Sequence, residues 1–249
     1  MKPHSICLFL ALTSLATAAD KPAHLFILSG QSNMGGMDPK LGFEPEAAAL
    51  FPNADVAYIK VALARQPIRC WLEEWDDIAK KHGIDPAKAH TGDESKLAVF
   101  YHAILDQFPE LLKKHPNPAS VTFCWMQGER DAKEHLDAAY GDALKQLIAN
   151  LRRDLKQSDM NFVIGRLSDA GKADDAPWQA VRRVQIDLTK ADPRGAWVDC
   201  DDLNNKGQNG ELNDLHYTQK GYERLGRRYV RQAKTLIEGK KPVDNGRPE

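Results

Sequence analysis

Ser32, Gln127 and His216 are the side chains of this sequence whose types and positions best fit acyl-transfer chemistry. Ser32 follows an apolar run, residues 25–28, that ends abruptly at Ser29-Gly30. A short run without polar alternation is typical of a buried strand. A hydroxyl just beyond it lies at the carboxyl end of a parallel sheet, where ligands usually bind. We therefore take Ser32 as a candidate nucleophile, although helix capping is the commoner role of a serine after a strand.

A serine nucleophile needs a base within hydrogen-bond reach and a third group that orients the base. His216, which stands just before the last helix pattern, is the best placed of the eight histidines. His24, by contrast, begins a strand and belongs to the opposite end of the sheet. Gln127 and Glu129 follow another strand, and turn formation or helix capping is the alternative reading of both. Each signal is weak alone, but their joint placement after strands favours an active site.

Short apolar segments alternate with amphipathic ones along the chain. The strands are expected at residues 25–28, 56–63, 121–126, 162–165 and 196–198. Apolar residues at steps of three and four predict helices over residues 97–111, 136–155, 178–188 and 218–236. This alternation predicts one α/β domain, a three-layer α/β/α sandwich with a five-stranded parallel sheet.

The two ends of the 249-residue chain differ from this pattern. Residues 1–19 combine Lys2, an apolar core and small residues up to Ala19. That is the pattern of a secretory signal peptide, too short to span a membrane, with cleavage near Ala19. Residues 20–238 are expected to form the catalytic domain. Residues 239–249 are charged and contain proline, so we expect a disordered tail.

Charge and cysteine content restrict the partners. The formal net charge is −1, and it becomes −2 when the leader leaves with Lys2. A nearly neutral chain gives no electrostatic argument for nucleic acid or an anionic membrane as partner. Cys70, Cys124 and Cys200 remain after cleavage, with no CxxC pair and no histidine cluster typical of zinc. No metal or organic cofactor is expected, and a single disulfide of open pairing is compatible with export.

Three motifs resemble those of the SGNH hydrolases: Gly30-Gln31-Ser32-Asn33-Met34, Trp125-Met126-Gln127-Gly128-Glu129-Arg130-Asp131 and Asp214-Leu215-His216-Tyr217. More narrowly, they are similar to the carbohydrate-acetylesterase branch that includes sialate O-acetylesterases. Residues 66–71, 178–185 and 221–228 also resemble that branch, so the likeness covers nearly all of residues 23–236. The resemblance implies a flavodoxin-like SGNH hydrolase fold.

The resemblance also implies a role for each matched residue. Ser32 corresponds to the nucleophile and His216 to the general base. Gln127 and the backbone N–H of Ser32, with Gly92, correspond to the oxyanion hole, where an uncharged amide can donate to the developing alkoxide. The expected pocket and substrate contacts are Gln31, Asn33, Glu129 and Arg130.

The acidic member of the triad departs from the family pattern. Relatives commonly carry it three residues before the histidine, where this chain has Asn213. Asp214 stands two residues before His216 and is our expected acid. Glu129 in that role, or a Ser-His dyad with a backbone carbonyl, are the alternatives.

The function implied is that of a secreted or periplasmic serine esterase acting on acetylated carbohydrate. It removes acetyl groups from sialic acid, xylan or another glycan through an acyl-enzyme. An O-acetyltransferase of the same fold and a catalytically inert carbohydrate-binding relative are the alternatives. Trp71 and Trp178, if exposed, are candidates for stacking on a sugar, although burial is the commoner fate of tryptophan. The sugar and the oligomeric state do not follow from the sequence.

Overall fold

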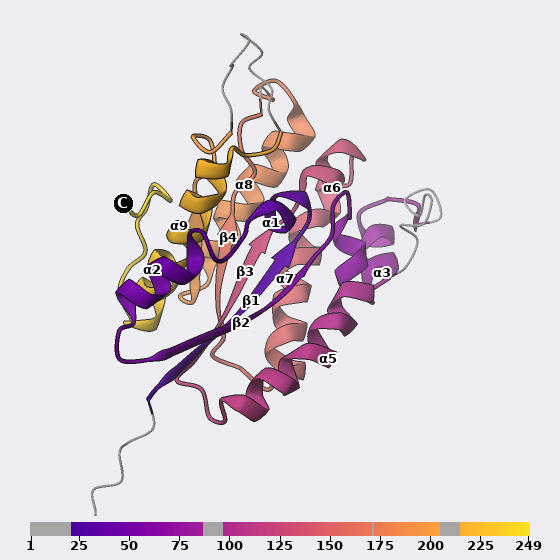
Figure 1. Ribbon diagram of the computed structural model, residues 1–249. Coiled ribbons are helices and arrows are strands. Elements are labelled where there is room, and N and C mark those ends of the chain that lie inside the picture. The colour runs from indigo at the N-terminus through magenta and orange to yellow at the C-terminus, as the bar shows by residue number, and fades with distance from the viewer. Residues whose placement is uncertain (1–20, 87–96, 171, 205–214) are drawn as a thin grey trace, which may run out of the picture.

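The computed structural model describes residues 21–86, 97–170, 172–204 and 215–249 as a three-layer α/β/α sandwich (Figure 1). Its five strands are all parallel and lie in the order β2-β1-β3-β4-β5. Their bounds are β1 Ala23–Gly30, β2 Asp55–Ala62, β3 Ser120–Met126, β4 Asn161–Gly165 and β5 Gly195–Val198. The fold class and all five predicted strands are therefore confirmed.

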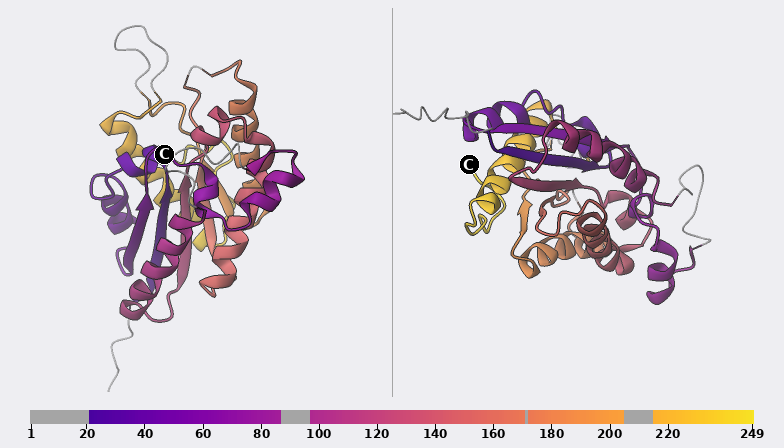
Figure 2. Two further views of the ribbon diagram at one scale, coloured as in Figure 1. Left: turned by 90° about the vertical axis from the view of Figure 1, so that its right-hand side faces the viewer. Right: turned by 90° about the horizontal axis from the view of Figure 1, so that it is seen from below.

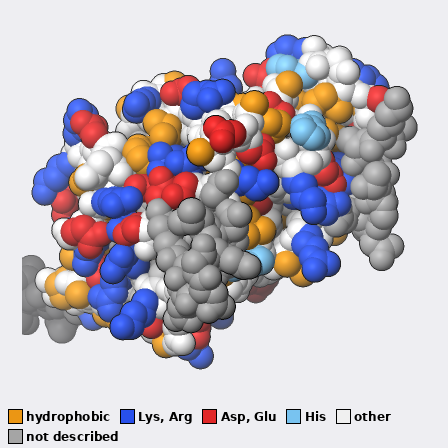
Figure 3. Space-filling model, turned by 90° about the horizontal axis from the view of Figure 1, so that it is seen from above, with side chains coloured by type: hydrophobic (Ala, Val, Ile, Leu, Met, Phe, Trp, Pro, Cys, Tyr) orange, Lys and Arg blue, Asp and Glu red, His pale blue; other side chains and the backbone are white. Residues whose placement is uncertain are grey.

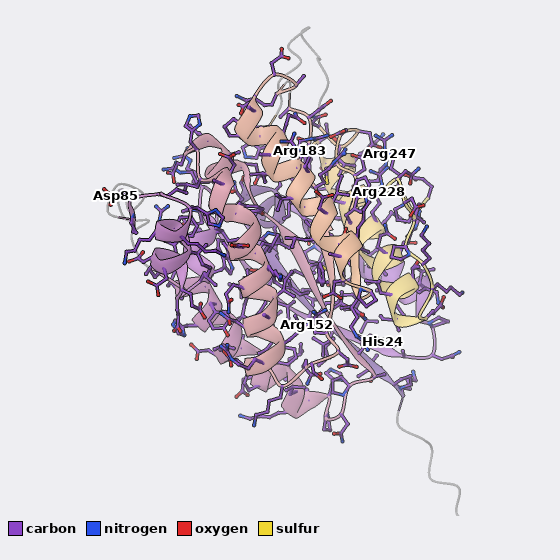
Figure 4. The ribbon with its side chains drawn as sticks, turned by 180° about the vertical axis from the view of Figure 1, so that it is seen from behind. His24, Asp85, Arg152, Arg183, Arg228 and Arg247 are labelled. Atoms are coloured by element: carbon purple, nitrogen blue, oxygen red, sulfur yellow. The ribbon has the colours of Figure 1, made fainter. Side chains whose placement is uncertain are left out.

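Helices cover both faces of the sheet. On one face lie α2 (Phe43–Leu50) and α9 (Gln219–Ile237), which pack against each other beside the sheet (Figures 1 and 2). The other face is covered by α5 (Val99–Lys114), α7 (Asp137–Asp154) and α8 (Ala176–Ala191), of which the last two lie side by side in Figure 4. The shorter elements are α1 (Ser32–Gly36), η1 (Ile68–Trp71), α3 (Trp75–Lys81) and α6 (Glu129–Lys133).

The core explains why β1 lacks polar alternation. All eight residues of β1 are buried, since the strand is central and covered on both faces. Trp71 and Trp178 also belong to the interior, with 0% and 4% of their surface exposed. Trp71 donates its indole hydrogen to Ser29 Oγ at 2.9 Å, and Trp178 donates to Ser168 O at 2.8 Å. The hypothesis that these two rings stack on a sugar is therefore wrong.

The C-terminal residues are ordered, which corrects the expectation of a disordered tail. Gly246 O accepts a hydrogen bond from Asp199 N at 2.8 Å, just beyond β5. Arg228 of α9 pairs with Glu249 at 2.6 Å, and Arg247 pairs with Asp199 at 2.7 Å (Figure 4). Charge alone suggested a solvated segment, but here the charged side chains find partners on the folded domain.

The described residues also bear on disulfide formation and on membrane-spanning helices. Cys70, Cys124 and Cys200 are all buried, and no disulfide joins any two of them. Within the described ranges, no helix has the length and apolarity needed to cross a membrane. The predicted leader falls in residues 1–20, outside the described residues.

Candidate active site

The turn after β1 presents Ser32 at the carboxyl edge of the sheet. Gly30 has φ +145°, and a Cβ there would lie 2.0 Å from Met126 O, so only glycine fits. Gln31 N then donates to Met126 O at 2.9 Å, which holds the turn against β3. Ser32 follows as the first residue of α1 and is half-buried. A small hydroxyl side chain is thus fixed at the strand end while its surface remains partly open.

The second motif lies beside the first because β1 and β3 are neighbours. Gly30 and Met126 are paired residues at the ends of these two strands. Gly128 has φ +136°, and a Cβ there would lie 2.8 Å from Val181 Cγ1. This turn lets α6 begin at Glu129. Helix α6 contacts α1 there, because Glu129 Oε1 accepts from Asn33 Nδ2 at 2.9 Å.

The histidine segment is joined to the serine motif by one side chain. Asn33 Nδ2 donates to Leu215 O at 3.2 Å, across 182 positions of sequence. Ser32 and His216 each stand one residue from a partner of that hydrogen bond. His216 is exposed, and the segment continues into Thr218, which caps α9 by accepting from Gly221 N at 3.0 Å. The structure therefore brings the first and third motifs together, as the sequence predicted.

Two of the predicted site residues cannot be placed. Asp214 and Gly92 both lie outside the described residues, as does Asn213. Their roles as triad acid and oxyanion donor stay predictions.

Gln127 lies in the expected region, but its amide donates hydrogen bonds to other groups of the protein. The side chain is fully buried. Its Nε2 donates to Gln66 O at 3.1 Å, lies 3.4 Å from Gln31 Oε1, and makes a short hydrogen bond with the Asp131 carboxyl. An amide nitrogen has two hydrogens, so these acceptors occupy both. This arrangement differs from the expected oxyanion contact, because the buried Asp131 takes up the donor.

Two buried carboxyl groups lie under the site, and both are shifted toward the protonated form. Burial raises the pKa of Glu129 to about 7. Burial likewise raises the pKa of Asp131 to about 7, against hydrogen bonds from Gln127 and Ile68 N that favour its charged form. Removal from water destabilises a carboxylate more than neutral donors stabilise it. Asp131 was missed by the sequence reasoning; its position in the Glu129-Arg130-Asp131 run was the available signal.

The four residues expected to contact substrate divide into two groups. Gln31, Asn33 and Glu129 are 3%, 1% and 5% exposed, and each is hydrogen-bonded across the contact between the serine turn with α1 and helix α6. They lie beneath the surface instead of on it. Arg130 is half-buried and pairs with Glu134 on the same helix. In this conformation Arg130 alone of the four has a side chain within reach of solvent.

Lys60 is a second residue that the sequence reasoning missed. Its Nζ donates to Gly35 O at 3.0 Å and to Met37 O at 2.5 Å, which satisfies carbonyls at the end of α1. Burial lowers the pKa of this amine. A lysine within the strand-forming run of residues 56–63 was the signal for such a half-buried role.

The surface around this edge is mixed in character. Seen from above, the described side chains intersperse acidic, basic and apolar types (Figure 3). Leu63 and Leu215 are exposed by 52% and 38%, and Leu63 N donates to Gly30 O beside the serine turn. Among the residues that the structure describes, no group of three or more His, Cys, Asp or Glu side chains is arranged to hold a metal.

The sequence matches one protein family over most of its length. Residues 36–235 match the family model described as carbohydrate esterase, sialic acid-specific acetylesterase. The chain belongs to this family. The matched range begins four residues after Ser32, so it does not include that residue. A search of curated proteins found no match.

Solved structures share the fold of this carbohydrate esterase. A protein from Arabidopsis thaliana aligns with a TM-score of 0.61 at 18% identity, over 87% of this chain and 98% of that one. XAC1771, a carbohydrate acetylesterase from Xanthomonas citri, aligns with a TM-score of 0.61 at 16% identity, over 90% of this chain and 58% of that one. NanS aligns with a TM-score of 0.58 at 12% identity, over 88% and 98%. The SGNH-type fold expected from the motifs is thereby confirmed.

Proposed function

We propose that this chain hydrolyses O-acetyl esters of carbohydrates through an acyl-enzyme on Ser32. The family membership supports a carbohydrate esterase. The observation that carries the assignment of residues is the Asn33–Leu215 hydrogen bond, which joins the serine turn to the segment of His216. This hydrogen bond supports a nucleophile and a base that come from distant parts of the chain to one edge of the sheet.

The reaction proceeds in two acyl transfers. Ser32 Oγ attacks the acetyl carbonyl while His216 takes the hydroxyl proton. The sugar oxygen then leaves with that proton as a free hydroxyl, and the acetyl group remains on Ser32. Water attacks this ester with His216 again as base, acetate leaves, and the serine hydroxyl is restored. The orienting acid is proposed to be Asp214.

The oxyanion is proposed to bind at the start of α1. The first N–H groups of a helix have no partner within it, and Ser32 is the first residue of α1. Its backbone N–H is proposed as a donor to the developing alkoxide, and Gly92 is the second donor expected from the family resemblance. For Gln127 to join them, its amide must exchange one of its present acceptors for the oxyanion.

The natural substrate is proposed to be an acetylated sugar met outside the cytoplasm. Residues 1–19 have the pattern of a cleaved leader. Sialic acid, xylan and other acetylated glycans are the candidates, and a panel of these assayed for released acetate distinguishes them. Transfer of acetyl to a sugar acceptor, with no acetate release in its absence, would instead identify an acetyltransferase.

Replacement of the nucleophile tests the proposal directly. Ser32→Ala and His216→Ala should each lower acetate release from p-nitrophenyl acetate and from the best glycan by at least about a thousandfold, as loss of triad members does. Ser120→Ala is the matched control, because Ser120 Oγ lies 2.8 Å from His24 Nδ1 at the amino end of the sheet. This control removes another serine in contact with a histidine (His24 is labelled in Figure 4) and should keep full activity. Retention of more than about a hundredth of the activity by Ser32→Ala would exclude the nucleophile.

A further inference from the structure

Asn33 is a buried side chain that links three parts of the site through hydrogen bonds. It is 1% exposed, and its carboxamide makes three hydrogen bonds to three separate elements. Nδ2 donates to Glu129 Oε1 of α6 at 2.9 Å and to Leu215 O at 3.2 Å. Oδ1 accepts from the Tyr222 hydroxyl of α9 at 3.1 Å. One side chain of the nucleophile helix thus contacts the elements on which both other motifs lie.

The chemistry of the three partners determines how this amide must point. The Leu215 carbonyl only accepts, and Glu129 Oε1 accepts whether the carboxyl is charged or carries its proton on Oε2, so both face the NH₂ group. The tyrosine hydroxyl donates to the remaining oxygen. Rotating the amide by half a turn would place its oxygen against two acceptors and lose both hydrogen bonds. The three partners therefore specify both the length of the side chain at position 33 and the orientation of its amide group.

The link is also what fixes the histidine segment near the serine. Leu215 O accepts from Asn33 Nδ2, and Tyr217 is buried with its hydroxyl 3.8 Å from Met126 Sδ. The next helix, α9, begins at Gln219. Leu215 and Tyr217 flank His216 on both sides. The backbone of His216 is thus held from below while its side chain remains exposed.

We propose that Asn33 is a positioning residue that holds the His216 segment against Ser32, with Glu129 as its buried anchor. This inference rests on the proposed roles of Ser32 and His216. We propose this role in place of the substrate contact expected for Asn33 from the sequence, since both amide hydrogens are used within the protein and the side chain is 1% exposed.

A positioning role affects turnover more than binding. Misplacement of a catalytic base by about 1 Å can lower a rate on the order of a hundredfold. The substrate does not touch a side chain that is 1% exposed, so KM should change little. We therefore expect Asn33→Ala to lower kcat about a hundredfold and to leave KM within about threefold of the native value.

Asn33→Asp adds a readout that a general loss of structure would not produce. The introduced carboxylate is nearly the same shape, yet it has no hydrogen to donate and faces the Glu129 carboxyl. When the introduced group is protonated, it has one O–H to donate and so restores part of the link. The ratio of variant to native kcat should therefore rise as the pH falls from about 8 to about 6.

Asn150 supplies the matched control. It is 3% exposed, and its Nδ2 donates to the Glu74 carboxyl at 3.0 and 3.1 Å, on α7 and away from the site. Asn150→Ala removes the same kind of buried amide–carboxylate contact. It should lower the melting temperature to a similar degree as Asn33→Ala while kcat stays native.

The experiment combines kinetics with hydrogen exchange of the peptide that contains His216. Asn33→Ala should lose kcat and accelerate amide exchange in that peptide, whereas Asn150→Ala should do neither. A native kcat in Asn33→Ala, or a raised KM with native kcat, would overturn the positioning role. If the native protein hydrolyses no acetyl ester, the proposed function fails. Exchange then decides the positioning role separately: unchanged exchange in Asn33→Ala would overturn it as well.

Discussion

Glu129→Gln tests the electrostatics of the site through the pH dependence of folding. The native carboxyl is 5% exposed, and burial raises its pKa from 4.5 to about 7. The folded state therefore holds this proton more tightly than the unfolded state. Its stabilising contribution is complete below about pH 4.5 and is lost as the pH rises through about 7.

The size of the effect follows from the shift. Each pKa unit corresponds to about 1.4 kcal/mol, so a rise from 4.5 to about 7 amounts to about 3 kcal/mol of unfolding free energy. Glutamine keeps an oxygen to accept from Asn33 Nδ2 but does not titrate. Relative to the native protein, the variant should therefore gain about 3 kcal/mol between pH 4 and pH 8. Any constant effect of the substitution cancels in this difference.

Urea unfolding of both proteins at several pH values between 4 and 8 measures the difference. Asp192→Asn is the control, because the pKa of Asp192 is shifted in the opposite direction. Burial raises this pKa, but the hydrogen bond from Arg152 and the other favourable contacts outweigh burial and lower it. Its contribution is present above pH 3.8 and is lost only as the pH falls below that value, so its difference curve should be flat from pH 4.5 to 8. A flat curve for Glu129→Gln would refute the assignment of a raised pKa to this carboxyl.

Three further outcomes are expected. Asp214→Asn should lower kcat about a thousandfold, by analogy with triad aspartates, while Glu129→Gln costs much less; the reverse ranking in steady-state kinetics would move the orienting role to Glu129. Gly246→Val should detach the C-terminal residues, because a Cβ there would lie 2.6 Å from the Trp197 ring and φ is +66°; limited proteolysis should cut the variant near its C-terminus and leave the native chain intact. The exported protein should begin near Asp20 by intact mass, and a full-length product in its host would contradict the leader.

Local sequence was sufficient for the fold because its signals are local. An apolar run such as residues 25–28 and apolar spacing such as that of residues 97–111 each report burial within one element. Parallel order then follows from the alternation of strand and helix. The same reasoning placed Ser32, Gln127 and His216 at one edge, because strand ends meet there in any such sheet.

Only the tertiary structure decided how the side chains at that edge are used. Gln127 and Asn33 carry the polar amide side chains expected of site residues, but each has a hydrogen-bond partner far away in the sequence, at 61 and 182 positions. No sequence period reports such partners, because they depend on how loops from different strands pack. Burial decided the rest: it raises the pKa of Glu129 and Asp131, and it removes Trp71 from the surface. The sequence by itself determined which elements carry the chemistry, and packing determined which of their polar groups face one another and which remain for a substrate.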